Sequence, residues 1–179
     1  MDDIEAAKRR AGERAARDVE DGTVVGLGSG STAAHAIRAL GERVADGLDV
    51  AGVPTSFQSR EVAKEAGVPL LAPEDVEAVD VAIDGADQVA GDALIKGGGG
   101  AHAREKLVDA AARELLIVVD ERKIADALDA RVPLEVLPEA RSIVAADVRE
   151  AGGEPSLRRA GEKSGPVVTD NGNLLLDCS

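Results

Sequence analysis

Short apolar segments alternate with longer segments of helical periodicity along most of this chain. The apolar segments, which we predict to be strands, are residues 23–27, 48–53, 79–83 and 115–119. The predicted helices are residues 4–19, 33–44, a segment after the turn at 55–56 that runs through 66, and 101–113. Apolar strands joined by helices form mostly parallel sheets with both faces covered. We therefore expect a Rossmann-like α/β domain over residues 1–128.

The pattern changes beyond that point. We predict strands at 132–137 and 154–159, a helix at 141–151, and a hairpin with arms at 167–170 and 173–177 around Asn171-Gly172. This order resembles the first β-α-β-β part of a ferredoxin-like unit, which needs one more helix and one more strand. We expect a small, incomplete α+β domain over residues 129–179 that is truncated at its C-terminus.

Composition excludes several classes of protein. Of the residues, 44% are hydrophobic, but Phe57 is the only aromatic one, so Val, Leu, Ile and Ala must build the core. A formal net charge of −13 repels phosphate backbones, which argues against a nucleic-acid partner. The single cysteine, Cys178, excludes a disulfide framework and a cysteine-based zinc site. Without a membrane-spanning apolar run or a secretory signal, the chain is expected to be cytoplasmic, with no membrane partner.

Gly28-Ser29-Gly30-Ser31-Thr32 joins the first predicted strand to the second helix. Glycines allow a ligand to approach the backbone, and the N–H groups of a helix start can bind phosphate. The segment is neither a Walker loop nor a complete G-x-G-x-x-G motif. On the residues alone, a phosphate site and an ordinary strand-to-helix turn are about equally favoured.

Asp84 and Asp87 follow the third apolar strand, where ligands of parallel sheets collect. A turn stabilised by local hydrogen bonds explains them equally well. A metal pair is conceivable, although His35 and His102 are the only histidines that could add ligands. Paired carboxylates also suit sugar hydroxyls, because a carboxylate accepts several hydrogen bonds.

Lys96 precedes four consecutive glycines, Gly97 to Gly100, which are costly in a simple linker. Such a segment suits a backbone that passes against a ligand, with Lys96 as a cation that faces developing negative charge. Glu105 follows in the next predicted helix, where a solvated surface position is the plain alternative. Lys123, after the fourth strand, is a candidate phosphate partner, and roles for Lys8 and His102 stay open.

Four stretches together resemble the ribose-5-phosphate isomerase family of the A type: GSGSTAAH at 28–35, DGADQ at 84–88, IKGGGGAHAREK at 95–106 and VTDNGNLLLD at 168–177. The resemblance extends from the first helix to the last residue, and the joint order and spacing of the motifs are highly specific. It implies an isomerase of the non-oxidative pentose phosphate pathway. Such an enzyme interconverts ribose 5-phosphate and ribulose 5-phosphate through an enediol(ate), with no cofactor and no metal. We expect a homodimer or homotetramer.

The resemblance also implies roles for individual residues. Glu105 would be the general base that moves a proton between C2 and C1, and Lys96 would stabilise the charge developing on oxygen. Asp84 and Asp87 would hold the sugar hydroxyls and assist their proton transfers. The implied substrate-binding residues are Ser29, Gly30, Ser31, Thr32, Asp84, Gly85, Ala86, Asp87, Lys96, Gly97, Gly98, Gly99 and Lys123. The chain departs from the family at Gln88, where Glu is frequent.

A non-catalytic sugar-phosphate-sensing module of the DeoR-like type is the alternative function. It has the same general architecture and would keep the phosphate loop, but it would not need a base at Glu105. A CoA transferase is a weaker alternative, because the sequence shows no basic or extended groove for CoA. Turnover of ribose 5-phosphate separates the isomerase from the sensing module.

Lysine is scarce in this acidic chain, with 6 Lys against 15 Arg. Together with the net charge of −13, this is typical of proteins from a salt-rich cytoplasm, where salt screens self-repulsion. We predict that the melting temperature rises between dilute buffer and molar KCl, as measured by circular dichroism. Equal melting temperatures would instead favour an ordinary acidic protein from a GC-rich genome.

Overall fold

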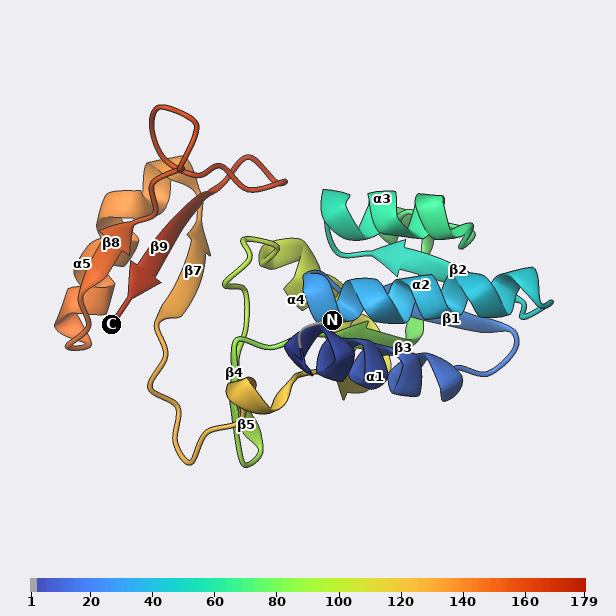
Figure 1. Cartoon of the computed structure of the whole chain (residues 1–179). Coiled ribbons are helices and arrows are strands. Elements are labelled where there is room, and N and C mark those ends of the chain that lie inside the picture. Colours follow the sequence, from blue (N-terminus) through green and yellow to red (C-terminus); the bar gives the residue numbers. More distant parts are fainter. Residues whose placement is uncertain (1–2) are drawn as a thin grey trace.

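The computed structural model describes residues 3–179 and has a central parallel sheet of four strands (Figure 1). The strands are β1 (Thr23–Leu27), β2 (Val50–Pro54), β3 (Val79–Asp84) and β6 (Ala112–Ile117), in the order β2-β1-β3-β6. All three strand pairs are parallel. This confirms the predicted parallel α/β sheet.

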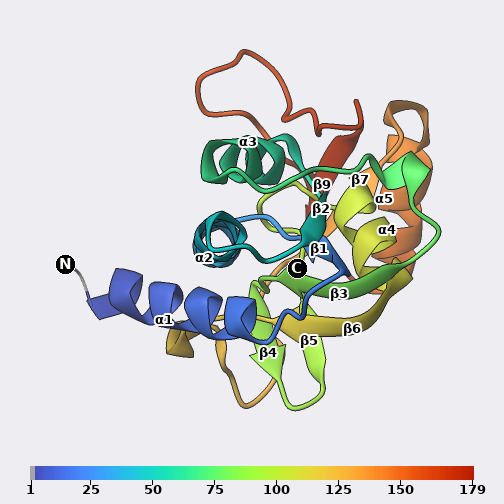
Figure 2. The same cartoon turned by 90° about the vertical axis from the view of Figure 1, so that its right-hand side faces the viewer.

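Helices cover both faces of the sheet (Figure 2). On one face lie α1 (Asp3–Arg17), α2 (Ser31–Ala45) and α3 (Phe57–Ala66), and on the other lies α4 (Ala103–Ala111). The larger core, between the sheet and the first three helices, consists of small aliphatic side chains such as Val25, Ile37 and Leu40. Val108 of α4 packs with Val53 and Val79 on the opposite face. The aliphatic core expected from the near absence of aromatics is therefore present.

Strand β6 begins and ends earlier than the sequence predicted. The prediction placed a helix up to residue 113 and a strand at 115–119, whereas α4 ends at Ala111 and β6 covers Ala112–Ile117. The charged pair Arg113-Glu114 fits a strand because β6 is the edge of the sheet, where a side chain can reach solvent.

A two-stranded hairpin, β4 (Gln88–Ala90) with β5 (Ala93–Ile95), separates β3 from α4 and was not predicted. These strands are too short for a clear alternating pattern. The Gln88 side chain anchors the hairpin to the chain after β6, because it accepts hydrogen bonds from the N–H groups of Asp129 and Ala130 and donates one to Asp129 Oδ1. An amide can both donate and accept, which a Glu carboxylate cannot do.

The C-terminal part forms a three-stranded antiparallel sheet in the order β7-β9-β8. Its elements are β7 (Val132–Val136), α5 (Arg141–Glu150), β8 (Pro155–Leu157) and β9 (Leu174–Cys178), and three short 3₁₀ turns at Pro73–Asp75, Glu121–Lys123 and Pro138–Ala140 complete the fold. This is the strand order of the first half of a ferredoxin-like unit, as expected. The division of the chain at residue 128 stays a prediction.

The predicted hairpin at 167–177 is only partly formed. A tight turn is present, since Gly172 N–H donates to Thr169 O and Thr169 N–H donates to Asn173 O. The first arm, however, is held by single bridges such as Val168 to Leu174, because β9 already pairs with β7 and β8 on its two sides. The first arm is left as a loop, and it reaches toward α3.

Within the described part of the chain, no helix has both the length and the apolar character needed to cross a membrane.

Candidate active site

A cavity of about 450 Å³ opens at the carboxyl ends of the central strands. Its wall consists of the segments after β1, β3 and β6, the glycine-rich segment before α4, and the loop before β9. Of the residues singled out from the sequence, those that line it are Ser29, Gly30, Ser31, Thr32, Gly85, Ala86, Asp87, Gly97, Gly98, Gly99, Glu105 and Lys123. Asp84 and Lys96 lie behind this wall. Lys96 contacts Glu105, and Asp84 accepts a hydrogen bond from the Gly85 N–H.

The glycine-serine segment turns directly from β1 into α2. Gly30 precedes the helix with a φ of 97°, a conformation that favours glycine. Gly28 lies so close to the end of β3 that a Cβ at this position would overlap the Asp84 carboxylate. The Ser29 N–H donates to Asp84 Oδ1 at 3.0 Å. The segment is therefore fastened to β3, and the first turn of α2, whose N–H groups lack intrahelical partners, lines the cavity.

The Ser29 hydroxyl belongs to a cluster of hydroxyl groups. Its Oγ atom lies 2.8 Å from Thr55 Oγ1 and 2.6 Å from Ser56 Oγ, at the end of β2. Gln58, the second residue of α3 (Phe57–Ala66), accepts a hydrogen bond from the Gly30 N–H at 2.8 Å. Ser56 and Gln58 both line the cavity, although the sequence analysis did not select them. The signal that could have found them is their place just after a predicted strand.

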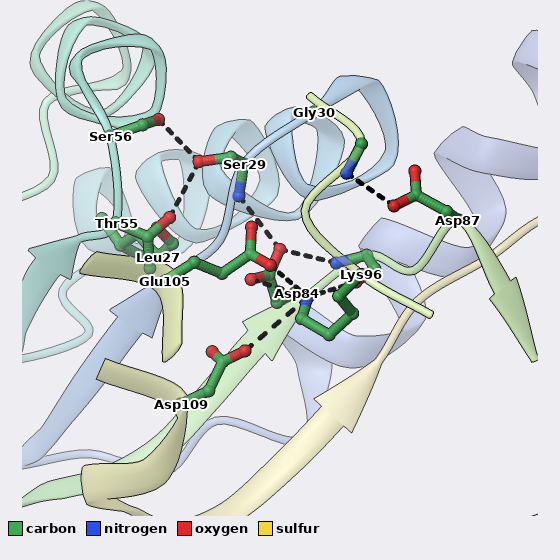
Figure 3. Close-up of polar contacts among 12 residues, drawn as sticks. Leu27, Ser29, Gly30, Thr55, Ser56, Asp84, Asp87, Lys96, Glu105 and Asp109 are labelled. Atoms are coloured by element: carbon green, nitrogen blue, oxygen red, sulfur yellow. Dashed lines mark hydrogen bonds and ion pairs between the residues drawn. The ribbon is translucent and has the colours of Figure 1, made fainter. Parts of the chain in front are cut away.

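The Lys96 ammonium lies among three carboxylates behind the cavity wall (Figure 3). Its Nζ atom is 3.0 Å from Asp84 Oδ2, 3.1 Å from Glu105 Oε1 and 3.6 Å from Asp109 Oδ2. It also donates a hydrogen bond to the Gly85 carbonyl. Burial disfavours the charge on Lys96, but the neighbouring carboxylates outweigh it and raise the pKa of the ammonium. Lys96 therefore remains a cation at neutral pH.

Glu105 is buried and yet reaches the cavity. It lies in the first turn of α4, and its side chain is 9% exposed. Burial and the charge of Asp84 raise the pKa of Glu105 to about 8, and Lys96 only partly opposes this. A carboxylate with a raised pKa is a stronger proton acceptor and can act near neutral pH. The plain alternative, a solvated surface glutamate, is thus wrong for Glu105.

Asp109 was missed by the sequence analysis. It follows Glu105 by four residues on α4, so both side chains lie on the same face of the helix. That spacing was the available signal, but it does not show whether the face is buried. Here Asp109 is 8% exposed, and burial together with the Asp84 charge raises its pKa to about 6.

The three carboxylates are a group among the described residues that comes close enough together for a cation, with oxygens within 4.8 Å of one another. The Lys96 ammonium, however, contacts all three and already supplies the positive charge. We therefore assign no metal ligands here. Asp87, considered from the sequence as half of a metal pair with Asp84, is not a member of this group.

Asp87 instead holds the glycine-rich segment. Its Oδ2 atom accepts a hydrogen bond from the Gly98 N–H at 2.6 Å. A Cβ at Gly98 would overlap this carboxylate, so a side chain at this position would displace Asp87 from the Gly98 N–H. The backbone of the segment thus follows the cavity wall, as expected for a chain that passes against a ligand.

Basic side chains line the cavity near the end of β6 and on α1. Lys8, Arg122 and Lys123 are among its lining residues. Lys8 also contacts Glu5 at 2.6 Å, and Arg122 forms an ion pair at 2.7 Å with Asp120. The hydrogen bond from Arg122 lowers the pKa of Asp120 to about 2. Lys8, left open by the sequence, is therefore placed at the cavity.

The small sheet positions the start of α4. Glu135 on β7 accepts a hydrogen bond from the Ala103 N–H, and His102 Nε2 donates to the Pro133 carbonyl at 2.8 Å. Glu135 also accepts hydrogen bonds from the side chains of Thr169, Asn171 and Asn173. Burial opposes its charge, but these hydrogen bonds hold the pKa of Glu135 below its usual value. His102 is therefore bound to the small sheet and does not line the cavity.

A family model matches most of this chain. Residues 51–179 match the family model described as ribose 5-phosphate isomerase A (phosphoriboisomerase A). The chain is 63% identical over 175 residues to ribose-5-phosphate isomerase A of Natronomonas pharaonis, a haloarchaeon, covering 98% of this chain and 77% of that protein.

Solved structures agree with this match. Ribose 5-phosphate isomerase A from Methanocaldococcus jannaschii superposes with a TM-score of 0.93 at 44% identity, over 97% of this chain and 79% of that one. A D-ribose-5-phosphate isomerase in complex with phospho-erythronic acid superposes with a TM-score of 0.94 at 40% identity, over 98% of this chain and 79% of that one.

The raised pKa of Glu105 predicts a pH-dependent stability. Between its ordinary pKa of 4.5 and about 8, the folded chain holds a proton that the unfolded chain has lost. The contribution of Glu105 to the free energy of unfolding therefore falls as pH rises through this window. Glu105→Gln removes this pH-dependent contribution. The free energy of unfolding of the variant minus that of the parent should therefore increase from about pH 4.5 to about pH 8.

Urea unfolding at pH 5, 7 and 9 measures this difference. The same substitution at the exposed Glu114 of β6 is the control. A difference for Glu105→Gln that stays constant from pH 5 to pH 9 would contradict the raised pKa.

Proposed function

This chain belongs to the ribose 5-phosphate isomerase A family and interconverts ribose 5-phosphate and ribulose 5-phosphate, and we propose that Glu105 is the base that moves the proton. The observation that carries the proposal is a buried carboxylate at the cavity wall, 3.1 Å from an ammonium. An aldose-ketose isomerisation moves one proton between adjacent carbons through an enediol(ate). It therefore needs one base that reaches both carbons and a positive group near the oxygen that gains charge.

Glu105 meets the requirement for the base. It lines the cavity, and its pKa of about 8 makes it a stronger acceptor than an exposed glutamate. Each turnover returns the same proton to the neighbouring carbon, so the carboxylate is restored without a redox cofactor. The reaction is balanced within one substrate molecule, which agrees with the expectation of an enzyme without cofactor or metal.

We assign the electrostatic role to Lys96. Its ammonium lies behind the wall, beside Glu105 and the Gly85 carbonyl, and the Lys96 side chain is 16% exposed. Charges act strongly in such surroundings, so Lys96 can stabilise an enediolate oxygen that approaches Gly85. Asp84 holds the ammonium at 3.0 Å, and Asp87, which lines the cavity, accepts sugar hydroxyls and assists their proton transfers.

The phosphate end of the substrate lies, in this proposal, against Ser31 and Thr32 of the first turn of α2, with Lys8 and Lys123 nearby. All four line the cavity. A helix start offers N–H groups to an anion, and the lysines add positive charge. The D-ribose-5-phosphate isomerase in complex with phospho-erythronic acid, a phosphorylated sugar acid, supports a ligand of this class. Ser29, Gly30, Gly85, Ala86 and Gly97 to Gly99 complete the proposed binding surface.

The oligomeric state is proposed from the family resemblance, and the location from the sequence, which shows no membrane-spanning run or secretory signal. We expect a homodimer or homotetramer that works in the cytoplasm on a small sugar phosphate.

Glu105→Gln is predicted to lower kcat for ribose 5-phosphate by about 10³-fold or more, because the amide cannot accept the proton. Substrate affinity should change only a few-fold, since the shape of the side chain is kept. The assay is run in molar KCl with EDTA present, and the parent should be unaffected by EDTA. Glu114→Gln is the matched control, and normal turnover of Glu105→Gln would show that the base is another group.

Lys96→Ala is predicted to lower kcat by about 10²–10³-fold, because the developing oxyanion loses its cation. Lys106→Ala, which removes a lysine from an exposed position on α4, should keep full activity. A parent protein that binds ribose 5-phosphate without turnover would instead indicate the sensing module and refute both roles.

A further inference from the structure

Asp109 is the member of the carboxylate cluster for which the proposed reaction has no role. It lies one helical turn after Glu105 on α4, its side chain is 8% exposed, and it does not line the cavity. Its Oδ2 atom is 3.6 Å from Lys96 Nζ, slightly farther than the oxygens of Asp84 and Glu105 (Figure 3). A buried carboxylate is costly unless it is paired with a positive charge and hydrogen-bonded.

The charges of the cluster do not balance. One ammonium faces three carboxylates, so full ionisation would leave a net charge of −2 in a buried site. Within residues 3–179, Asp109 Oδ1 is buried and has no hydrogen-bond partner, and the buried Asp84 Oδ2 has the ion pair with Lys96 as its contact. Such an excess favours the uptake of a proton by the group, and each carboxylate makes the ionisation of the others harder.

We propose that Asp109 is a positioning residue for the isomerisation, because it draws the Lys96 ammonium away from Glu105 and places a second negative charge beside the base. Both effects make the Glu105 carboxylate a stronger proton acceptor. Asp109 acts through Glu105 and Lys96 and touches no substrate. The proposal rests on the assignment of Glu105 as the base.

The charged groups that face Glu105 come from three segments and from the cavity. Lys96 comes from the segment after β5, Asp84 from the end of β3, and Asp109 from α4. The charged groups on the cavity side are Lys8, Asp87, Asp120, Arg122, Lys123 and Asp170. The pKa of Asp109, raised to about 6 mainly by burial, lies below the value of about 8 for Glu105. The proposal therefore requires that Asp109 ionises before Glu105.

Asp109→Asn tests the proposal, because it removes the charge and keeps the shape. The acid limb of the pH profile of kcat/KM should shift by about one pH unit toward lower pH. At the plateau kcat should fall about threefold, since a weaker base accepts the proton more slowly. KM should change less than twofold, because Asp109 lies behind the wall. A merely structural role would leave the pH midpoint in place.

Two further variants control the measurement. Asp109→Glu keeps the charge and should keep the acid limb of the parent. Asp147→Asn removes the same charge from an exposed position on α5 and should not shift the profile. A folded Asp109→Asn protein with the acid limb of the parent, or a shift of equal size in Asp147→Asn, would overturn the proposal.

Direct titration separates this inference from the proposed function. Carboxyl ¹³C NMR of the parent and of Asp109→Asn follows Glu105 without any assay. The Glu105 midpoint should fall by about one unit in the variant, and in the parent Asp109 should ionise before Glu105. If Asp109 in the parent keeps its proton throughout the titration of Glu105, the inference fails even when Asp109→Asn does not fold. If Glu105→Gln retains turnover but the Glu105 midpoint still falls in Asp109→Asn, the proposal that Glu105 is the base fails. The electrostatic coupling between Asp109 and Glu105 is then still supported.

Discussion

The contact of one lysine ammonium with three buried carboxylates organises the site. It joins the end of β3, the segment after β5 and the first two turns of α4, so the three segments that surround the reaction centre meet at one cation. Buried ion pairs are weak evidence for stability, because desolvation offsets much of their attraction. This cluster also carries an excess of negative charge. Its effect is therefore better understood as chemistry: burial and the charge of Asp84 raise the pKa of Glu105, and the three carboxylates keep Lys96 charged.

The small sheet takes part in this arrangement although it contributes none of the three carboxylates. Glu135 on β7 binds the first N–H of α4 and also the side chains of the turn at 169–173. The loop before β9 lines the cavity, and Asp170 accepts a hydrogen bond from the Phe57 N–H at the start of α3 at 2.7 Å. The position of Glu105 thus depends on residues that lie about thirty and about sixty-five positions later in the chain.

Much of the fold could be predicted because its signals are local. Apolar strands, glycine turns and helical periodicity each depend on neighbouring residues, and they gave the parallel sheet and the order of the small one. The failures have physical reasons. β4 and β5 are too short to show a period. β6 contains charged residues that fit an edge strand. The first arm of the last hairpin forms no regular strand, because β9 pairs with β7 and β8 on its two sides.

The sequence by itself determined which chemical groups are present. The place of Asp84 and Asp87 after an apolar strand and the glycines after Lys96 made these residues candidates, and the family resemblance added the role of Glu105. Tertiary structure decided what state those groups adopt. Asp109 and Glu105 have the spacing of an ordinary pair on a helix surface, and only the packing of α4 against β3 and Lys96 shows that both are buried. The reason is that the pKa of a carboxyl group depends on the loss of water and on charges that distant segments bring near it. No local pattern contains that information.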